Sequence, residues 1–284
     1  MADEGIFLQA EANLEWADDG HFTQVARAWG QEALAHLMPD LDQRLGNGEP
    51  KYTTMSAVLP TFTAAVEVAA YTPQRWSAIM AGLGRRPAGV GLEIFDKQAL
   101  DEEAEAPDRG RLSVDSATMD GRWGTLLTVA GADGDAATEA SYYARWVDFL
   151  AVTLDQANPA FGVVSDDFLV QATALDLALG RSYEQSLDDS RRLLRGYGFI
   201  TVVPAELVDR LSGVSSLAGS GAFARVKSLA AGGAVLQATA TLPQFDDEAL
   251  RRVFWTLAPV LPSGIPHPLP GYEDIRVVYQ DAAS

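Results

Sequence analysis

The spacing of apolar residues along the chain predicts several helices. The first begins near Gly20, where apolar residues recur three or four positions apart and so share one face: Phe22, Val25, Trp29, Ala33 and Leu37. It ends before Pro39, because proline cannot continue a helix. Further helices are predicted over residues 73–83, 138–155, 204–211 and 247–258. The second of these has an apolar stripe formed by Tyr143, Trp146, Val147, Leu150 and Leu154. Asp246 is a candidate N-cap for the last one, with Phe245 and Leu250 placed as a hydrophobic staple.

Strands are predicted where β-branched and apolar residues run between turn signals. They cover residues 61–71, 90–95, 111–117, 123–129, 161–164, 198–203, 223–229 and 234–240. Asp120-Gly121 favours a hairpin between the third and fourth of these strands, and Gly232-Gly233 separates the last two.

The two halves of the chain repeat one order of elements, namely strand, helix opened by proline, strand, turn, strand and helix. Hairpin-connected antiparallel strands with amphipathic helices on one face satisfy this order. We therefore predict an α+β fold of two pseudo-repeated lobes of antiparallel sheet covered by amphipathic helices. The N-terminal lobe would cover residues 1–167 and the C-terminal lobe residues 196–284. Between them, residues 168–195 would form a connector with only short helical pieces.

The composition indicates a folded and acidic protein. Of the 284 residues, 48% are hydrophobic and 21% are charged, which is typical of a globular chain and not of a disordered one. Asp and Glu number 39 against 21 Lys and Arg, for a formal charge of -18. Nucleic acids and anionic membranes attract basic surfaces, so we expect neither as a partner, whereas a basic protein would be steered toward this chain. Solubility alone is an alternative reason for the acidity.

The sequence offers no recognisable thiol, metal or cofactor site. It has no cysteine, which excludes disulfides, thiolate metal ligands and a cysteine nucleophile. The three histidines, His21, His36 and His267, have no metal-ligand spacing. The glycines between positions 82 and 91 follow a predicted helix, whereas phosphate-binding loops lie between a strand and a helix. We expect no catalytic residues, no cofactor and no metal.

The N-terminal residues do not follow the pattern of a secretory signal. Asp3 and Glu4 stand where such a signal carries positive charge. The most apolar stretch, residues 58–71, is interrupted by Pro60 and Glu67 and is shorter than the ~20 apolar residues of a membrane span. We therefore expect a cytoplasmic protein.

Acidic residues gather in a few short runs. The densest, in a polar loop, consists of Asp101, Glu102, Glu103 and Glu105, and smaller runs are Asp166-Asp167, Asp188-Asp189 and residues 246–248. Most such runs are solvated surface. Paired carboxylates perform acid–base chemistry or hold Mg²⁺ when one is buried near the other and their pKa values are driven apart. Arg191, Arg192 and Arg195 are expected to offset the acids just upstream.

Six segments share a pattern of apolar residues and glycines. They are residues 71–76, 91–95, 194–214, 220–226, 232–238 and 253–262. This pattern resembles the bacterial immunity protein 52 family and the type VI immunity families, over most of residues 60–280. The resemblance implies an α+β protein that neutralises a cognate toxin by binding it, and it implies no catalytic residues.

Three functions are compatible with these observations. The first is a non-enzymatic immunity-type protein that binds a basic toxin, with the carboxylates of Asp101, Glu102, Glu103 and Glu105 as the partner-binding groups. The second is a small-molecule enzyme that uses a carboxylate pair in the cleft between the lobes. The third is an acidic scaffold or assembly protein.

Overall fold

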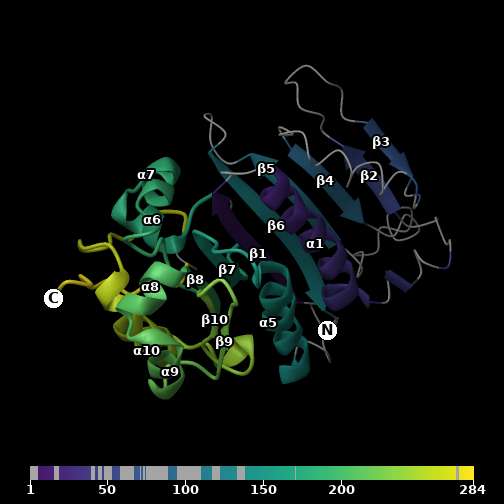
Figure 1. Ribbon diagram of the computed structural model, residues 1–284. Helices are drawn as coiled ribbons and strands as arrows, with labels where there is room; N and C mark the ends of the chain where they lie inside the picture. Colours follow the sequence, from purple (N-terminus) through teal and green to yellow (C-terminus); the bar gives the residue numbers. More distant parts are fainter. Residues whose placement is uncertain are drawn as a thin grey trace. The chain divides into compact units, whose positions relative to one another are not determined.

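The fold is seen in a computed structural model that describes most of the chain (Figure 1). The described residues are 6–15, 19–39, 42–43, 47, 53–57, 67–70, 72, 74, 89–94, 110–116, 122–132, 138–169, 171–272 and 275–284. The chain divides into two units. The first contains Met1–Ala10 and Glu15–Ala137, and the second contains Glu11–Leu14 and Thr138–Ser284.

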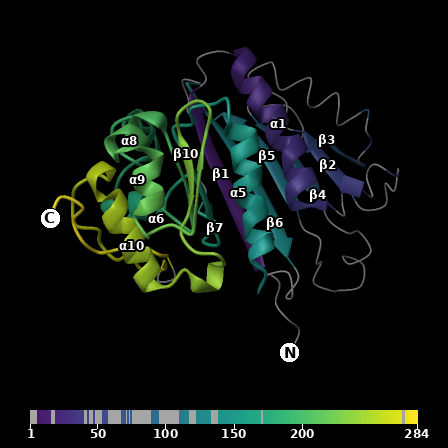
Figure 2. The same ribbon diagram turned by 60° about the horizontal axis from the view of Figure 1, so that its bottom comes forward.

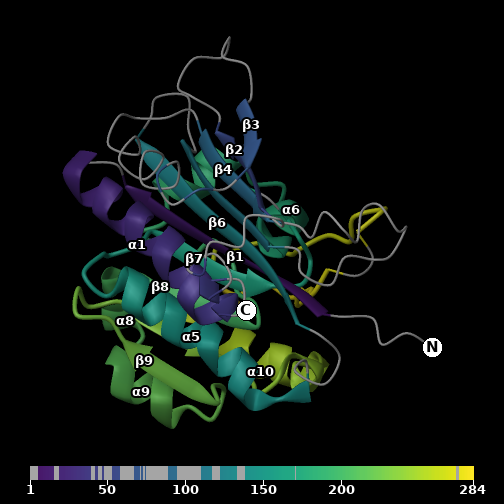
Figure 3. The same cartoon turned by 90° about the vertical axis from the view of Figure 1, so that its right-hand side faces the viewer.

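The first unit contains a sheet and one long helix. Its elements are β1 (Ile6–Glu15), α1 (Asp19–Leu37), β2 (Thr53–Ala57), β3 (Glu67–Ala70), β4 (Gly89–Ile94), β5 (Gly110–Ser116) and β6 (Trp123–Ala132). The strand order is β3-β2-β4-β5-β6-β1, and neighbouring strands from β3 to β6 are antiparallel. α1 lies along β5 and β6 on one face of this sheet (Figures 1 and 3).

The apolar face predicted for the first helix is the face that α1 buries. Its five apolar residues, Phe22, Val25, Trp29, Ala33 and Leu37, are each at most 5% exposed. Gly124 in β6 leaves room for one of them, because a Cβ atom there would lie 2.1 Å from a ring carbon of Phe22. The helix therefore packs closely on the strand where no side chain intervenes.

β1 is a strand that the sequence analysis did not predict. Leu8, Ala10, Ala12 and Leu14 alternate along it with Gln9, Glu11 and Asn13, and both sets are buried. An alternation of period two is the pattern of a strand. Because the polar set is buried too, its side chains need hydrogen-bond partners inside the protein.

The second unit surrounds a smaller sheet with helices (Figure 2). Its helices are α5 (Ala140–Leu154), α6 (Ala174–Leu179), α7 (Tyr183–Asp188), α8 (Ala205–Arg210), α9 (Gly213–Gly219) and α10 (Asp247–Leu257), with short 3₁₀ turns η3 (Leu242–Gln244) and η4 (Ala258–Val260). Its strands are β7 (Phe161–Ser165), β8 (Ile200–Val203), β9 (Arg225–Ser228) and β10 (Ala234–Gln237). The order is β1-β7-β8-β10-β9, in which β1 contributes Glu11–Leu14. The pairs from β7 to β9 are antiparallel.

Helices α5 and α10 confirm two predictions from the sequence. The predicted apolar stripe of α5, formed by Tyr143, Trp146, Val147, Leu150 and Leu154, is fully buried. At α10, the side chain of Asp246 accepts a hydrogen bond from the backbone N–H of Ala249 at 2.9 Å, as expected of an N-cap. Local signals were sufficient here because each helix has one apolar face and an identifiable first residue.

The α+β class is confirmed, since antiparallel strands and helices are both present in each unit. The division of the chain differs from the predicted lobes. Residues 138–167 and the whole predicted connector, 168–195, belong to the second unit. The physical reason is that β7 pairs with β8 across this segment, with Gly162 opposite Val202. The predicted short helical pieces are α6 and α7. Apart from Gln74, the predicted helix over 73–83, on which the repeat depends, lies outside the described residues.

In the described ranges, no helix combines the length and the apolar character needed to cross a bilayer. The long helix α1 has 19 residues, but it carries polar and charged side chains among its apolar ones.

Candidate functional site

The acidic loop proposed from the sequence as a partner-binding site cannot be placed. Its four residues, Asp101, Glu102, Glu103 and Glu105, lie outside the described part of the chain. The described residues instead bring a second acidic run, Asp166-Asp167, to the wall of a pocket in the second unit.

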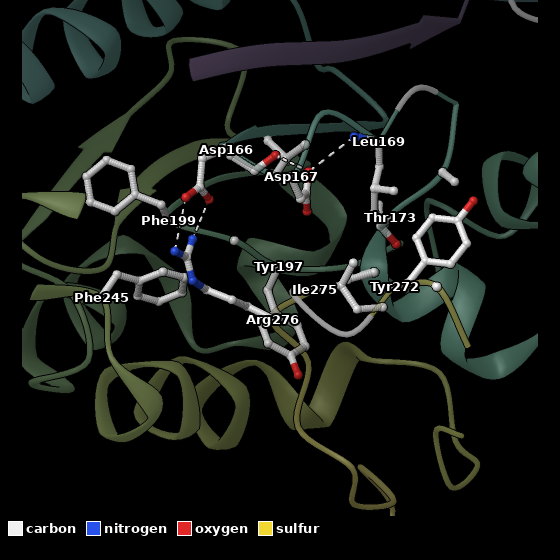
Figure 4. A pocket seen from close by; sticks show the side chains of 16 residues that line it. Asp166, Asp167, Leu169, Thr173, Tyr197, Phe199, Phe245, Tyr272, Ile275 and Arg276 are labelled. Carbon is white, nitrogen blue, oxygen red and sulfur yellow. Dashed lines mark hydrogen bonds and ion pairs between the residues drawn. The ribbon is translucent and has the colours of Figure 1, made fainter. Parts of the chain in front are cut away.

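This pocket has a volume of about 370 Å³, which is within the usual range of ligand pockets. One wall is the segment that leads from β7 into α6, and another is the C-terminal segment around Tyr272, Ile275 and Arg276 (Figure 4). Aromatic side chains complete the lining, among them Tyr197 and Phe199 just before β8 and Phe245 between η3 and α10. Acidic, basic and aromatic groups therefore share one small cavity.

Hydrogen bonds organise the wall that follows β7. The hydroxyl of Ser165 donates to Asp167 Oδ1 at 2.6 Å, and the backbone N–H of Leu169 donates to the same oxygen at 3.3 Å. Phe168 and Gln171 adopt φ values of 52° and 57°, a left-handed backbone conformation that residues other than glycine rarely adopt. Backbone strain of this kind is common where a loop is held in one functional geometry.

The opposite wall holds Arg276, the one basic side chain among the described residues that line the pocket. Arg276 forms a bidentate ion pair with Asp166, in which Nη2 donates to Oδ2 at 3.0 Å and Nη1 donates to Oδ1. Its guanidinium carbon also lies 6.0 Å from the ring centre of Phe245. Both oxygens of Asp166 are therefore engaged, and its charge is balanced.

Asp167 has different partners from its neighbour Asp166. Burial raises the pKa of the Asp167 carboxyl above its ordinary value, while the hydrogen bonds from Ser165 and Leu169 offset part of this effect. The negative charge of Asp166 acts in the same direction as burial, and the positive charge of Arg276 acts against it. Burial of one carboxyl beside another is one of the conditions that the sequence analysis set for carboxylate chemistry, and the Asp167 carboxyl beside Asp166 meets it.

A second cluster of charged groups in the same unit is sealed from solvent. Arg195, whose side chain is 0% exposed, donates to Asp176 Oδ2 through Nη2 at 2.9 Å and Nε at 3.2 Å. Its Nη1 donates to Asn13 Oδ1 at 2.5 Å and to Glu11 Oε1 at 3.4 Å. The guanidinium carbon lies 4.8 Å from the ring centre of Tyr183. We call these residues the Arg195 cluster.

The first helix after β7 positions this cluster. Thr173 and Asp176 form a capping box at the start of α6, with the N–H of Asp176 donating to Thr173 Oγ1 at 3.0 Å. Asp176 Oδ1 accepts a further hydrogen bond from the hydroxyl of Ser186 at 2.6 Å. The T-x-x-D spacing is visible in the sequence and indicates a helix start, but it does not indicate which cation Asp176 binds.

Glu11 is the second buried acid of the Arg195 cluster, at 2% exposed. Burial raises the pKa of its carboxyl above the ordinary value, although the charge of Arg195 and the hydrogen bond from the backbone N–H of Gln171 oppose this effect. If Glu11 and Asp176 were both ionised, the cluster would hold two negative charges against one positive charge. The raised pKa is consistent with that imbalance.

The predicted pairing of three arginines with upstream acids is only partly right. Arg192 pairs with Asp189, as expected from their spacing. Arg191 pairs instead with Glu206, and Arg195 pairs with Asp176 and with Glu11, which is 184 positions away. Packing between distant segments decided these partners. No group of three potential His, Asp or Glu metal ligands occurs within the described ranges.

Comparisons with known proteins add a likeness of fold. No protein-family model matches the chain, and no curated protein matches it. Among solved structures, the Pseudomonas aeruginosa T6SS protein PA0821 is similar, with a TM-score of 0.56 and 13% sequence identity. The alignment covers 96% of this chain and 79% of that one. At this identity the similarity is one of fold, and the resemblance to the immunity protein 52 family stays a resemblance.

Proposed function

We propose that this chain is a non-enzymatic immunity-type protein that binds and neutralises a cognate bacterial toxin. The similar fold of a T6SS protein supports a role related to type VI secretion. Residues 194–214, one of the segments that resemble immunity families, contain β8 and the pocket-lining residues Tyr197 and Phe199. These two sources of support are independent, because one comes from the fold and the other from the sequence.

The observation that carries the proposal is the pocket beside Asp166 and Asp167. It combines a charged lining with exposed aromatic side chains, since Tyr272 lines it and is 46% exposed. Phe168, between the lining residues Asp167 and Leu169, is 45% exposed. Aromatic residues exposed next to a pocket are typical of protein-binding surfaces. The strained φ of Phe168 keeps its ring in this position at a cost in free energy.

The charge of the chain indicates the kind of partner. A formal charge of -18 favours fast association with a basic protein and disfavours nucleic acid and anionic membranes. In this proposal the carboxylates of Asp101, Glu102, Glu103 and Glu105 steer the basic toxin toward the protein. The protein acts in the cytoplasm, and binding of the toxin requires no cofactor.

Affinity capture followed by a growth assay tests the proposal. The tagged chain is crosslinked in the source bacterium, and the captured protein is cloned and expressed in a second host. We expect a basic protein that stops growth when expressed alone and no longer does so when co-expressed with this chain. An unrelated protein of similar negative charge is the control for unspecific electrostatic capture. A captured protein that is harmless, or whose toxicity persists during co-expression, would contradict the proposal.

A second candidate function is an enzyme that acts on a small molecule. It is favoured by the contrast between Asp166, which is paired with Arg276, and Asp167, whose pKa is raised by burial. Incubation of the purified protein with a small-molecule extract, followed by mass spectrometry, discriminates between the two functions. Turnover that disappears in Asp167→Asn would favour the enzyme, whereas an unchanged extract would favour the binding protein.

A further inference from the structure

One carboxylate oxygen in the pocket has no hydrogen-bond partner in the part of the chain that the structure describes. Both hydrogen bonds to Asp167, from Ser165 and from Leu169, end on Oδ1. Among the described residues, none donates a hydrogen bond to Oδ2. The pocket therefore offers a ligand one acidic acceptor atom, and Figure 4 shows the Asp167 side chain beside the open space between its loop and the C-terminal segment.

The rest of the lining suits a positive charge on an apolar stem. Tyr197, Phe199, Phe245 and Tyr272 provide aromatic surface around the cavity. Aromatic faces attract cations, and they also pack against methylene groups. The hydroxyl of Tyr197 already accepts a hydrogen bond from the backbone N–H of Val278 at 2.9 Å, so this residue contributes mainly its ring.

The number of available oxygens discriminates between an ammonium and a guanidinium group. A guanidinium binds best to two carboxylate oxygens in parallel, and within the pocket Asp166 offers such a pair. That position is taken by the protein's own Arg276. An ammonium is a compact charge that needs no second oxygen on the same carboxylate, and the one open oxygen of Asp167 meets this requirement.

From these observations we infer that the pocket binds the side chain of a lysine that projects from the partner protein. This inference rests on the proposed function, because it assigns the partner's contact to the pocket described above. The lysine ammonium lies against Asp167 Oδ2, and its four-carbon stem packs on the aromatic lining. The acidity of the whole chain makes a basic partner complementary in charge.

A titration with small amines tests the pocket without any knowledge of the partner. n-Butylammonium reproduces the stem and charge of lysine, n-butanol reproduces the stem without the charge, and n-propylguanidinium reproduces arginine. Binding to the intact protein is followed by NMR through the aromatic ring resonances. We expect n-butylammonium to bind more tightly than either of the other two.

Three variants locate the binding. Asp167→Asn retains an oxygen that can accept the hydrogen bonds from Ser165 and Leu169 but loses the charge, and it should weaken n-butylammonium by about tenfold. Tyr272→Leu should weaken n-butylammonium more than n-butanol. Asp209→Asn makes the same chemical change at an exposed position on α8 and should leave binding unchanged. Circular dichroism of each variant verifies that it is folded.

The inference is overturned if Asp167→Asn binds n-butylammonium as the parent does, or if n-propylguanidinium binds as tightly. The partner gives an independent readout. A captured toxin whose affinity is the same for Asp167→Asn and Asp209→Asn would contradict the lysine contact but leave the proposed function standing. Specific amine binding together with no toxin in the growth assay would contradict the proposed function and retain an amine-binding pocket.

Discussion

The second unit contains two arginine sites built from similar groups, and they differ in their access to solvent. In the Arg195 cluster the guanidinium meets two acids and an aromatic ring, and its side chain is 0% exposed. At the pocket, Arg276 meets Asp166 and the ring of Phe245, with the second acid Asp167 beside them, and its side chain is 40% exposed. The same combination of an arginine, two acids and an aromatic ring therefore occurs once in the protein interior and once at a pocket that is open to solvent.

The difference shows how burial separates a structural site from a candidate binding site. Inside the protein, Asp176 receives donors from Arg195, Ser186 and the backbone, because a buried polar group without a partner is costly. At the pocket, water or a ligand can satisfy Asp167 Oδ2, so the fold tolerates an oxygen without a partner there. An incomplete set of partners at a partly exposed acid is thus the feature that distinguishes the pocket.

The largest expected effect comes from removing each arginine in turn. Arg195→Met should destabilise the protein by about 3–5 kcal/mol, because it leaves Asp176 buried without its cation. Arg276→Met should cost less than about 1 kcal/mol, since its ion pair with Asp166 is partly exposed. Urea unfolding measures both. Equal losses would mean that the two sites do not differ in the way described.

A smaller effect is expected when the buried acid of the sealed site is made permanently neutral. The pKa of Glu11 is raised in the folded state, so folding favours its protonated form. The stability that protonation of Glu11 contributes is complete at a pH below the pKa of the unfolded chain. It is lost as the pH rises through the pKa of the folded protein. Glu11→Gln is neutral at every pH. Its stability relative to the parent protein should therefore increase from acidic to neutral pH.

Unfolding curves at several pH values between 4 and 8 test this expectation for Glu11→Gln. The matched control is Glu248→Gln, which changes an acid that is 81% exposed. The control reports what the same exchange of Glu for Gln does at an exposed position. A stability difference for Glu11→Gln that is independent of pH would show that Glu11 titrates alike in the folded and unfolded states.

The preference of the open site should change when its own cation is removed. Arg276→Met frees both oxygens of Asp166, which then form an acceptor pair suited to a guanidinium. We expect the affinity for n-propylguanidinium to rise by about tenfold or more, as one hydrogen bond to a charged group would give, while that for n-butylammonium changes less. The NMR titration described above measures both ligands. An unchanged ratio between them would mean that Arg276 does not determine the selectivity.

The smallest effect concerns the strained residue next to the pocket. At most positions glycine is less stable than alanine, but at the φ of 52° found at Phe168 the order should reverse, because glycine adopts this conformation freely. Phe168→Gly should therefore be more stable than Phe168→Ala by about 1 kcal/mol. Thermal unfolding of the two variants provides the comparison. A more stable alanine variant would argue against a left-handed backbone at this position.

Local patterns determined much of the fold. The stripe of α1, the stripe of α5 and the Asp246 cap of α10 are readable because each depends on residues within a few positions of one another. β1 is readable as well, since Leu8, Ala10, Ala12 and Leu14 alternate with polar residues in the period of a strand. Its polar residues gave no indication that they would be buried.

Only the tertiary structure decided which charged groups meet. Asp166-Asp167 stands out in the sequence as a short acidic run, yet its cation, Arg276, comes from 110 positions further along the chain. Glu11 and Arg195 are 184 positions apart. Helix and strand periodicity depends on near neighbours, whereas ion pairs, pockets and burial arise when distant segments pack together. The sequence by itself therefore determined the acidity of the protein and those elements that have a clear local pattern, and packing determined the sealed cluster and the pocket.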